Sequence, residues 1–505
     1  MIEDFEQCYR ALQSRDPRFD GWWVAAVATT GVYCRPSCPA TTPKRANVSF
    51  YPTAAAAQQA GYRACKRCRP NATPGSPEWA ARSDVVARAM RLIADGAVDR
   101  DGVAGLGRQL GYSARHLERL LLAEVGTGPV ALARAQRAQA ARLLVETTDL
   151  AMSEVAFAAG FSSIRQFNAT VAAVFATSPT RLRAQAAARG VTPAPGAHGL
   201  ALRLPFRAPL CPDNLWGHLA ATAVPGCEEV GAGTYRRSLR LAHGPGVVAL
   251  RPTPTHVAAD LALADLRDLA PAIARCRRLL DLDADPVAVD AALGTDAALA
   301  PVVAKSPGRR VPGAADEEEM AVRAVLGQQI STAAARSHAG RLVRTLGTPL
   351  PGPAGGLTHL WPTAGALAAA DPATLGLPAA RRATFAAVAG ALAGGRLRLG
   401  PGADWAEARA ALAAIPGVGP WTAEMVAMRA LGDPDAFPAT DLGVRRGAQA
   451  LGIPTGPPAD LVARAQRWRP WRAYAVVYLW SVLDHPVNRW PGALPAGPRP
   501  RRSRD

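Results

Sequence analysis

Four cysteines near the N-terminus have a spacing that suits a metal ion. Three residues separate Cys34 from Cys38, two separate Cys65 from Cys68, and 26 residues lie between the two pairs. Two close pairs on separate loops are typical of a tetrahedral zinc site with thiolate ligands. The remaining cysteines of the chain are scattered, at Cys8, Cys211, Cys227 and Cys276. We therefore expect one Zn²⁺, which is either purely structural or also activates a thiolate.

Basic residues surround these four cysteines. They are Arg35, Lys44, Arg45, Lys66, Arg67 and Arg69. Zinc keeps a thiol ionised at neutral pH, and lysine and arginine side chains beside it can hold a phosphate backbone. The cluster is therefore suited to chemistry on a nucleic-acid phosphate.

The segments GVYCRPSCPA, NVSFY and GYRACKRCRP resemble the Ada-type DNA methylphosphotriester acceptor domain over about residues 5–72. The resemblance implies that Cys34 is both a zinc ligand and the nucleophile that takes a methyl group from a methylated DNA phosphate. Cys38, Cys65 and Cys68 would be the other ligands. A four-thiolate zinc site carries about two negative charges, and methylation of one thiolate removes about one of them. We expect DNA binding to tighten after methyl transfer, because repulsion falls.

A carboxylate after a tight turn is the second candidate for chemistry. The segment LAAIPGVGPWTAEMVAMRA (412–430) predicts two helices joined by a hairpin, in which Gly417 and Gly419 let the backbone turn. N–H groups at the second helix can bind a DNA phosphate. Asp441 follows Trp421 by twenty residues, and a carboxylate can stabilise a sugar cation and orient or deprotonate water. An ordinary turn and a helix-capping aspartate are the alternatives.

This hairpin, with AFPATDLGVRRG, VRAVLGQQIS and RWRPWRAYAVVYLW, resembles the AlkA type of helix-hairpin-helix DNA glycosylase, DNA-3-methyladenine glycosylase II, over residues 200–487. The resemblance implies that Asp441 is catalytic and that Trp421 and Trp480 line the pocket for a flipped purine. Aromatic faces suit a cationic alkylated purine, although core packing is an alternative role for each indole. At the position of Gln329, an AlkA-type glycosylase has a leucine that fills the space left in the DNA base stack by the flipped nucleotide.

Three absences narrow the expected reaction. Glycosylases that also cleave the DNA backbone have a lysine after this hairpin, where this chain has Trp421, so we expect hydrolysis to an abasic site without lyase activity. Residues 442–505 contain no cysteine, so no iron-sulfur cluster is expected. The PCHR motif of the Ada methyltransferase module is also absent. Direct reversal of O6-methylguanine is therefore not expected.

Two helix-turn-helix units are predicted between these sites, at 103–126 and 151–175, with turns at Gly111 and Gly160. GFSSIRQF matches the signature of the AraC-type DNA-binding domain, which residues 83–185 resemble. A connecting helix of about 20 residues spans about 30 Å, so both recognition helices can enter successive major grooves. Candidate DNA contacts are Arg115, His116, Arg119, Arg165 and Gln166.

Length and charge agree with several DNA-binding modules. A chain of 505 residues is too long for a single hydrophobic core, so several domains are expected. A net charge of +18 favours a polyanionic partner, although a high-GC genome also enriches a protein in arginine. The apolar runs are too short to cross a membrane, and the start is acidic rather than a secretory signal. We expect a cytoplasmic, nucleoid-associated monomer that binds damaged and operator double-stranded DNA, with RNA polymerase as a candidate partner.

The expected fold class is multidomain and mainly α with α+β parts. The expected domains are a zinc-bound α+β module at 1–76, an all-α double helix-turn-helix at 83–188, a linker at 189–199, an AlkA-like α+β subdomain at 200–283, a helix-hairpin-helix glycosylase domain at 284–490 and a disordered basic tail at 491–505.

The expected function combines repair and regulation. The glycosylase half would release alkylated purines such as 3-methyladenine and 7-methylguanine, while methyl transfer to Cys34 would sense methylphosphotriesters and activate transcription. One alternative is a DNA-binding regulator whose glycosylase half only holds damaged DNA. Another is a glycosylase whose zinc module is structural and transfers no methyl group.

Overall fold

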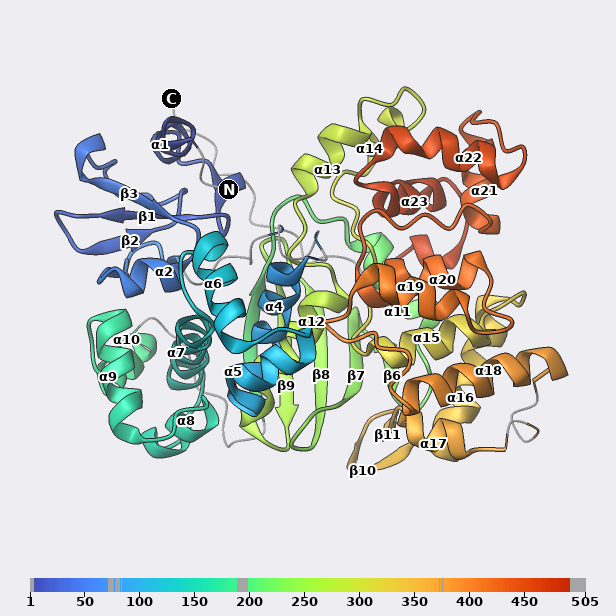
Figure 1. Cartoon of the computed structure of the whole chain (residues 1–505), viewed down its shortest axis with the longest axis horizontal. Coiled ribbons are helices and arrows are strands. Elements are labelled where there is room, and N and C mark those ends of the chain that lie inside the picture. The colour runs from blue at the N-terminus through green and yellow to red at the C-terminus, as the bar shows by residue number, and fades with distance from the viewer. Residues whose placement is uncertain are drawn as a thin grey trace.

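A computed structural model of the chain describes residues 4–70, 77, 82, 84–188, 199–371, 373 and 377–490. A five-stranded sheet lies in the middle, with the N-terminal modules on one side and the C-terminal helices on the other (Figure 1). The described elements confirm the expected multidomain, mainly α class with α+β parts. Residues 189–198 of the expected linker and the expected tail at 491–505 lie outside the described residues.

The N-terminal module is a small α+β unit whose strand pairing brings the cysteine pairs together. Its elements are α1 (Phe5–Gln13), β1 (Val24–Val27), β2 (Val32–Cys34), β3 (Val48–Tyr51), α2 (Ala54–Gln59) and β4 (Arg63–Ala64), in sheet order β3-β1-β2-β4. Strands β2 and β4 run parallel, with Tyr33 opposite Ala64. Because parallel strands end on the same side, Cys34 and Cys65 meet at one end of this pair.

Seven helices form the two predicted helix-turn-helix units and the helix that joins them. They are α4 (Val85–Ala94), α5 (Ala97–Leu110), α6 (Ala114–Val125), α7 (Pro129–Thr147), α8 (Met152–Ala158), α9 (Ile164–Phe175) and α10 (Pro179–Ala187). The hydroxyls of Ser113 and Ser163 accept N–H bonds of 3.2 Å at the starts of α6 and α9. Helix α7 has 19 residues and is therefore about 28 Å long.

The central sheet is antiparallel, in the order β5-β9-β8-β7-β6. Its elements and neighbouring helices are β5 (Leu200–Pro205), α11 (Pro212–Thr222), β6 (Glu228–Gly231), β7 (Thr234–Arg240), β8 (Pro245–Pro252), β9 (His256–Leu263) and α12 (Leu269–Leu279). Buried and less buried residues alternate along β8 and β9. Because successive side chains of a strand point to opposite faces, both strands have one face in the core.

Helices predominate in the C-terminal part, with one exception to expectation. The elements are α13 (Pro286–Leu293), α14 (Ala300–Lys305), α15 (Glu317–Leu326), α16 (Thr332–Leu346), β10 (Thr348–Ala354), β11 (Leu357–Leu360), α17 (Ala364–Ala369), α18 (Ala379–Ala393), α19 (Trp405–Ala413), α20 (Pro420–Val426), α21 (Leu442–Ala450), α22 (Pro458–Ala465) and α23 (Arg472–Ser481). The proline-rich stretch from Thr348, within the expected helix-hairpin-helix domain, is one strand of a β-hairpin. Leu350, Leu357 and Leu360 bury one face of this hairpin in a small apolar cluster.

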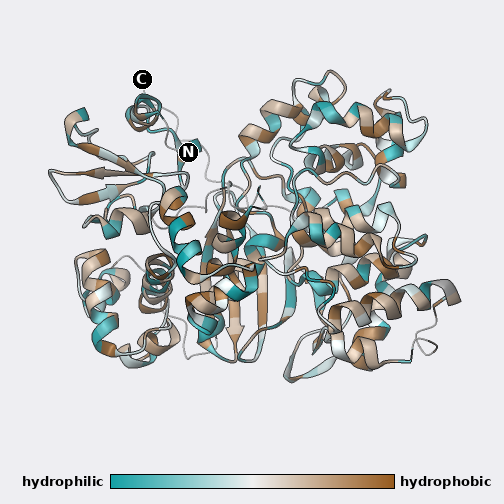
Figure 2. Ribbon diagram, in the orientation of Figure 1, coloured by the Kyte–Doolittle hydropathy of each residue, from teal (hydrophilic) through white to brown (hydrophobic). Residues whose placement is uncertain are grey.

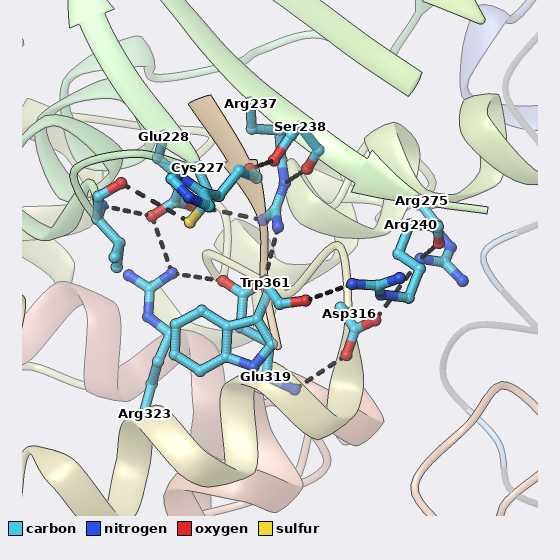
Figure 3. A network of polar contacts seen from close by, with 12 residues as sticks. Cys227, Glu228, Arg237, Ser238, Arg240, Arg275, Asp316, Glu319, Arg323 and Trp361 are labelled. Carbon is cyan, nitrogen blue, oxygen red and sulfur yellow. Dashed lines mark hydrogen bonds and ion pairs between the residues drawn. The ribbon is translucent and has the colours of Figure 1, made fainter. Parts of the chain in front are cut away.

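A buried network of charges joins the central sheet to α15 (Figure 3). Arg237 of β7 contacts Glu319 of α15 at 2.7 Å and Glu228 at 3.4 Å. Arg323, one turn beyond Glu319, contacts Glu228 at 2.9 Å and Glu319 at 2.8 Å. Burial raises the pKa of Glu228, but the charges of Arg323 and Arg237 outweigh it, and the net shift is downward. Two carboxylates and two guanidiniums thus fix α15 against the sheet.

Most helices carry both hydrophobic and hydrophilic residues (Figure 2), as helices that pack one face on a core and expose the other require. The largest apolar cluster lies among the C-terminal helices and includes Val426, Val477 and Leu479. Among the described residues, every helix is too short or too polar to cross a bilayer.

The modules contact one another through arginines that bind backbone carbonyls. Arg88 of α4 donates to the carbonyl oxygen of Gly402 at 2.8 Å, so the first helix-turn-helix unit contacts the C-terminal helices. Arg207, just after β5, donates to the carbonyl oxygen of Asp20 at 2.7 Å. The zinc module is thereby attached to the AlkA-like half, far away in the sequence.

Candidate functional sites

The four predicted zinc ligands lie together. The sulfur atoms of Cys34, Cys38, Cys65 and Cys68 all lie within 4.8 Å of one another, and none of these residues is more than 9% exposed. Sulfurs at the corners of a tetrahedron with Zn–S bonds of about 2.3 Å lie about 3.8 Å apart. The arrangement therefore accommodates a zinc ion.

The proton chemistry of the cluster also fits a cation. Hydrogen bonds with Cys38 and Cys68, with burial, raise the pKa of the Cys34 thiol. Hydrogen bonds with Cys34 and Cys68 lower the pKa of Cys38 to about 2. Four neighbouring sulfurs cannot all ionise unaided, because each thiolate opposes the next. A divalent cation supplies the charge that lets all four do so.

Several basic side chains near the cluster contact other parts of the chain. Arg35 pairs with Asp20 at 3.5 Å, and Arg45 pairs with Glu6. Arg69 pairs with Glu146 of α7 at 3.5 Å.

The other three basic residues near the cluster are exposed, as Arg45 also is. Lys44 and Arg67 are exposed, and so is Lys66, whose ammonium lies 3.4 Å from the carbonyl oxygen of Ala176 at the end of α9. Among the six basic residues predicted to hold phosphate, Arg45 and Lys66 are thus exposed and also contact other parts of the chain.

The predicted DNA contacts of the helix-turn-helix units lie on two different helices. Arg115, His116 and Arg119 belong to α6, and Arg115 and Arg119 are exposed. His116 stacks on Tyr112 with ring centroids 5.2 Å apart, and Arg119 contacts its Nδ1 at 3.0 Å.

On α9, Arg165 and Gln166 are exposed. The side-chain oxygen of Gln166 accepts a hydrogen bond from the Ser162 hydroxyl at 3.1 Å. Gln166 therefore helps to order the start of α9.

The hairpin between α19 and α20 needs glycine at one position. Gly417 has φ +84°, and a Cβ there would lie 1.9 Å from the Thr384 hydroxyl oxygen. Gly419 has φ −86° and open space around a would-be Cβ. Both glycines were predicted to let the backbone turn, but only Gly417 adopts the left-handed conformation.

The predicted intercalation loop lies against this hairpin. Gln328 donates to the carbonyl oxygen of Gly417 at 3.1 Å and to the Thr422 hydroxyl at 2.9 Å. The next residue, Gln329, is exposed and has φ +55°. Gln328, which the sequence analysis did not single out, therefore links the loop to the hairpin.

Asp441 lies at the centre of a compact polar group. Its Oδ1 accepts a hydrogen bond from the Val444 N–H at 2.8 Å, so it caps α21. The indole N–H of Trp480 donates to the same oxygen at 2.9 Å, and that of Trp421 donates to Oδ2 at 2.8 Å. The structure thus brings together the three residues that the sequence analysis placed at the glycosylase site. It also shows that capping occurs alongside the other contacts.

Two glycines that were not predicted to have a role allow this assembly. A Cβ at Gly443 would lie 2.9 Å from Cδ1 of Trp480, and one at Gly447 would lie 2.0 Å from the carbonyl oxygen of Leu479. Helices α21 and α23 can approach closely only because both positions lack side chains. The four-residue spacing of the two glycines on one helix face was the available signal.

An open cavity of about 120 Å³ lies beside α16, lined in part by His338, Arg341 and Arg344. Asp441 and the two indoles do not line it. The cavity is therefore separate from the predicted purine site.

Comparisons with known proteins cover nearly the whole chain. Family models match for the metal binding domain of Ada at residues 7–71, a helix-turn-helix domain at 106–185 and the AlkA N-terminal domain at 201–316. A Mycobacterium tuberculosis protein named "Probable bifunctional transcriptional activator/DNA repair enzyme AlkA" is 62% identical over 97% of this chain and 99% of its own length.

Two Escherichia coli proteins match different parts. DNA-3-methyladenine glycosylase 2 is 34% identical over 52% of this chain and 91% of its own length. The bifunctional transcriptional activator/DNA repair enzyme Ada is 39% identical over 27% of this chain and 37% of its own length.

Proposed function

This chain belongs to the family of bifunctional AlkA-type transcriptional activator and DNA repair proteins, and from this we propose roles for the residues of its candidate sites. The C-terminal half is a DNA-3-methyladenine glycosylase of the AlkA family, and the N-terminal part is an Ada-type regulator with a zinc-binding domain and a helix-turn-helix domain. The observation that carries the catalytic assignment is the Asp441 carboxylate, which follows the hairpin and is bound by two indoles.

Asp441 is proposed to promote hydrolysis of the N-glycosidic bond of an alkylated purine. As the bond breaks, its electron pair leaves with the cationic base, which departs neutral, and positive charge develops on the sugar. The carboxylate stabilises that charge and orients a water molecule, whose oxygen bonds to C1′ while its proton passes through the carboxylate to solvent. The products are a free purine and an abasic site.

Release of free base from methylated duplex DNA tests this assignment. We expect the wild-type chain to release 3-methyladenine and 7-methylguanine, and Asp441→Asn to reduce release at least about 100-fold, because the neutral amide cannot stabilise the sugar cation. Asparagine retains a capping oxygen for α21, so folding should survive. Asp213→Asn, at an exposed position of α11, is the matched control. Release by Asp441→Asn at the wild-type rate would contradict the assignment.

The glycosylase is proposed to lack lyase activity. Trp421 occupies the position after the hairpin at which lyases carry a lysine, and an indole cannot form a Schiff base. The DNA strand should stay intact after base release until alkali is added. Strand cleavage in neutral buffer, or a borohydride-trapped covalent complex, would contradict this proposal.

Cys34 is proposed to accept a methyl group from a methylphosphotriester. Its sulfur attacks the methyl carbon, an S–C bond forms, and the C–O bond breaks with its electron pair on the phosphate oxygen. The products are a thioether and an ordinary phosphodiester. Zinc bound by Cys34, Cys38, Cys65 and Cys68 would keep the sulfurs ionised at neutral pH.

Mass spectrometry of the peptide containing Cys34 tests the transfer. After incubation with methylated DNA we expect one added methyl group on Cys34, and none on Cys211, which lies outside the cluster. Cys34→Ala should leave the methylphosphotriester in the DNA, whereas Cys211→Ala should remove it normally. An unmethylated Cys34 after complete loss of the triester would favour a structural zinc site.

Methylation of Cys34 is further proposed to strengthen operator binding by the helix-turn-helix domain. Loss of one negative charge from the cluster reduces repulsion between the zinc module and DNA phosphates. Arg115, Arg119 and Arg165 face solvent on α6 and α9, which suits contact with double-stranded DNA. Mobility-shift titrations of methylated and unmethylated protein at fixed salt would measure the difference.

A further inference from the structure

Both oxygens of the Asp441 carboxylate are held by donors that have no acceptor capacity. Indole and backbone N–H groups only donate, and an ionised carboxylate only accepts, with about two lone-pair positions on each oxygen. Oδ1 accepts from the Val444 N–H and the Trp480 indole, at 2.8 and 2.9 Å. Oδ2 accepts from the Trp421 indole at 2.8 Å.

The distribution of these bonds is unequal between the two oxygens. Two donors fill the lone-pair positions of Oδ1, whereas one donor leaves a position of Oδ2 open. A sugar cation or a water molecule therefore has one oxygen of Asp441 available to it. The orientation of that oxygen is set by the Trp421 bond on one side and by the two bonds to Oδ1 on the other.

We infer that Trp421 and Trp480 are positioning residues that act through their N–H groups, and that Oδ2 of Asp441 is the oxygen that faces the reacting sugar. This inference rests on the proposed glycosylase function and adds a role distinct from lining a base pocket with aromatic faces. The indoles lock the carboxylate plane before DNA binds, so no reorientation is needed when charge develops on the sugar.

Backbone architecture supports the positioning role. Trp480 lies near the end of α23, where this helix packs closely on α21. The absence of a side chain at Gly443 leaves room for the Trp480 indole. A Cβ at Gly443 would lie 3.0 Å from both the Trp480 indole nitrogen and Oδ1 of Asp441. Trp421 is the second residue of α20, directly after the hairpin. Two separate helices thus each present one indole N–H to the same carboxylate.

Trp421→Phe and Trp480→Phe test the N–H groups, because phenylalanine keeps an aromatic face and removes the donor. A hydrogen bond to a charged group is strong enough that each substitution should lower kcat about 10- to 100-fold. KM should change by less than about threefold, since the face that would contact a base remains. Trp471→Phe is the control, since Trp471 lies at the start of the same α23 helix and packs on Tyr474.

A double-mutant cycle separates positioning from packing. In an Asp441→Asn background the tryptophan substitutions should lower the residual kcat by less than about threefold, because the group that they position is gone. A rise in KM with unchanged kcat, or equal losses with and without Asp441, would overturn the inference and leave the indoles as pocket walls.

Indole N–H resonances provide a readout that does not depend on catalysis. In ¹⁵N-tryptophan-labelled protein, Asp441→Asn should shift the N–H signals of Trp421 and Trp480 and leave that of Trp471 in place. If these shifts occur but wild-type protein releases no base, the two indole N–H bonds to Asp441 are confirmed and the glycosylase proposal fails. Unshifted indole signals would show that these bonds are absent and would overturn the inference even if base release is normal.

Discussion

At the scale of single residues, each candidate centre depends on a few side chains held close together: four sulfurs within 4.8 Å of one another, and one carboxylate that accepts two indole N–H bonds. The cysteine spacing located the cluster, and the hairpin motif located Asp441. The bonds from Trp421 and Trp480 to Asp441 were not predictable, because they depend on how closely α21 and α23 pack. The requirement for glycine was likewise visible as a motif, yet the sequence could not separate Gly417 from Gly419.

Substitution of these two glycines should have unequal effects. In Gly417→Ala the methyl group meets the Thr384 hydroxyl oxygen and the residue keeps a left-handed φ of +84°. We expect a loss of about 2 kcal/mol or more in the free energy of unfolding, measured by urea denaturation. Gly419→Ala, with φ −86° and open space, should change it by less than about 1 kcal/mol. Equal losses would show that the hairpin relaxes around the added methyl group.

At the scale of elements, period and turn signals predicted the helix-turn-helix units and the strands of the central sheet. The β10–β11 hairpin was missed because its proline- and glycine-rich sequence is typical of a turn. Antiparallel pairing of the two strands and the apolar contacts of Leu350, Leu357 and Leu360 form only in the folded chain. The ion network between the sheet and α15 was also missed. Its members lie on β6, β7 and α15, and no local pattern connects them.

Removal of one guanidinium from this network should be costly. In Arg237→Met the buried carboxylates of Glu228 and Glu319 lose a shared cation, and we expect the free energy of unfolding to fall by about 3–5 kcal/mol. Arg251→Met breaks the Arg251–Asp260 pair, whose side chains are 52% and 53% exposed, and should cost less than about 1 kcal/mol. Urea titrations of both variants make the comparison, and similar losses would contradict a network that fixes α15.

The same network predicts a dependence on pH. Because the pKa of Glu228 is lowered in the folded state, its ionisation stabilises the fold above the unfolded pKa of about 4.3. That contribution is lost as the pH falls through the folded value. The stability difference between wild type and Glu228→Gln should therefore be largest near neutral pH and shrink below about pH 4. A constant difference between pH 7 and pH 3 would show that Glu228 is already protonated at neutral pH.

At the scale of the whole molecule, the three modules could be assigned from the sequence, but their mutual contacts could not. Arg88 and Arg207 bind carbonyl oxygens of Gly402 and Asp20, and a backbone carbonyl is present at every residue, so it leaves no sequence signal. These contacts matter for coupling between the sites. Asp20 also accepts hydrogen bonds from Ser37, which lies in the loop between Cys34 and Cys38 of the cysteine cluster.

Arg207→Met should loosen the zinc module from the AlkA-like half. Arg207 is 6% exposed and also donates to the carbonyl oxygen of Asp283 at 2.9 Å, so it is held between the two parts. Without this charged donor, the rate of hydrogen-deuterium exchange at residues 17–38 should rise about tenfold or more, because local opening becomes easier. Arg203→Met, on the exposed face of β5, is the matched control. Unchanged uptake in Arg207→Met would mean that the modules are held by their other contacts, and that the zinc loop does not depend on the AlkA-like half for its order.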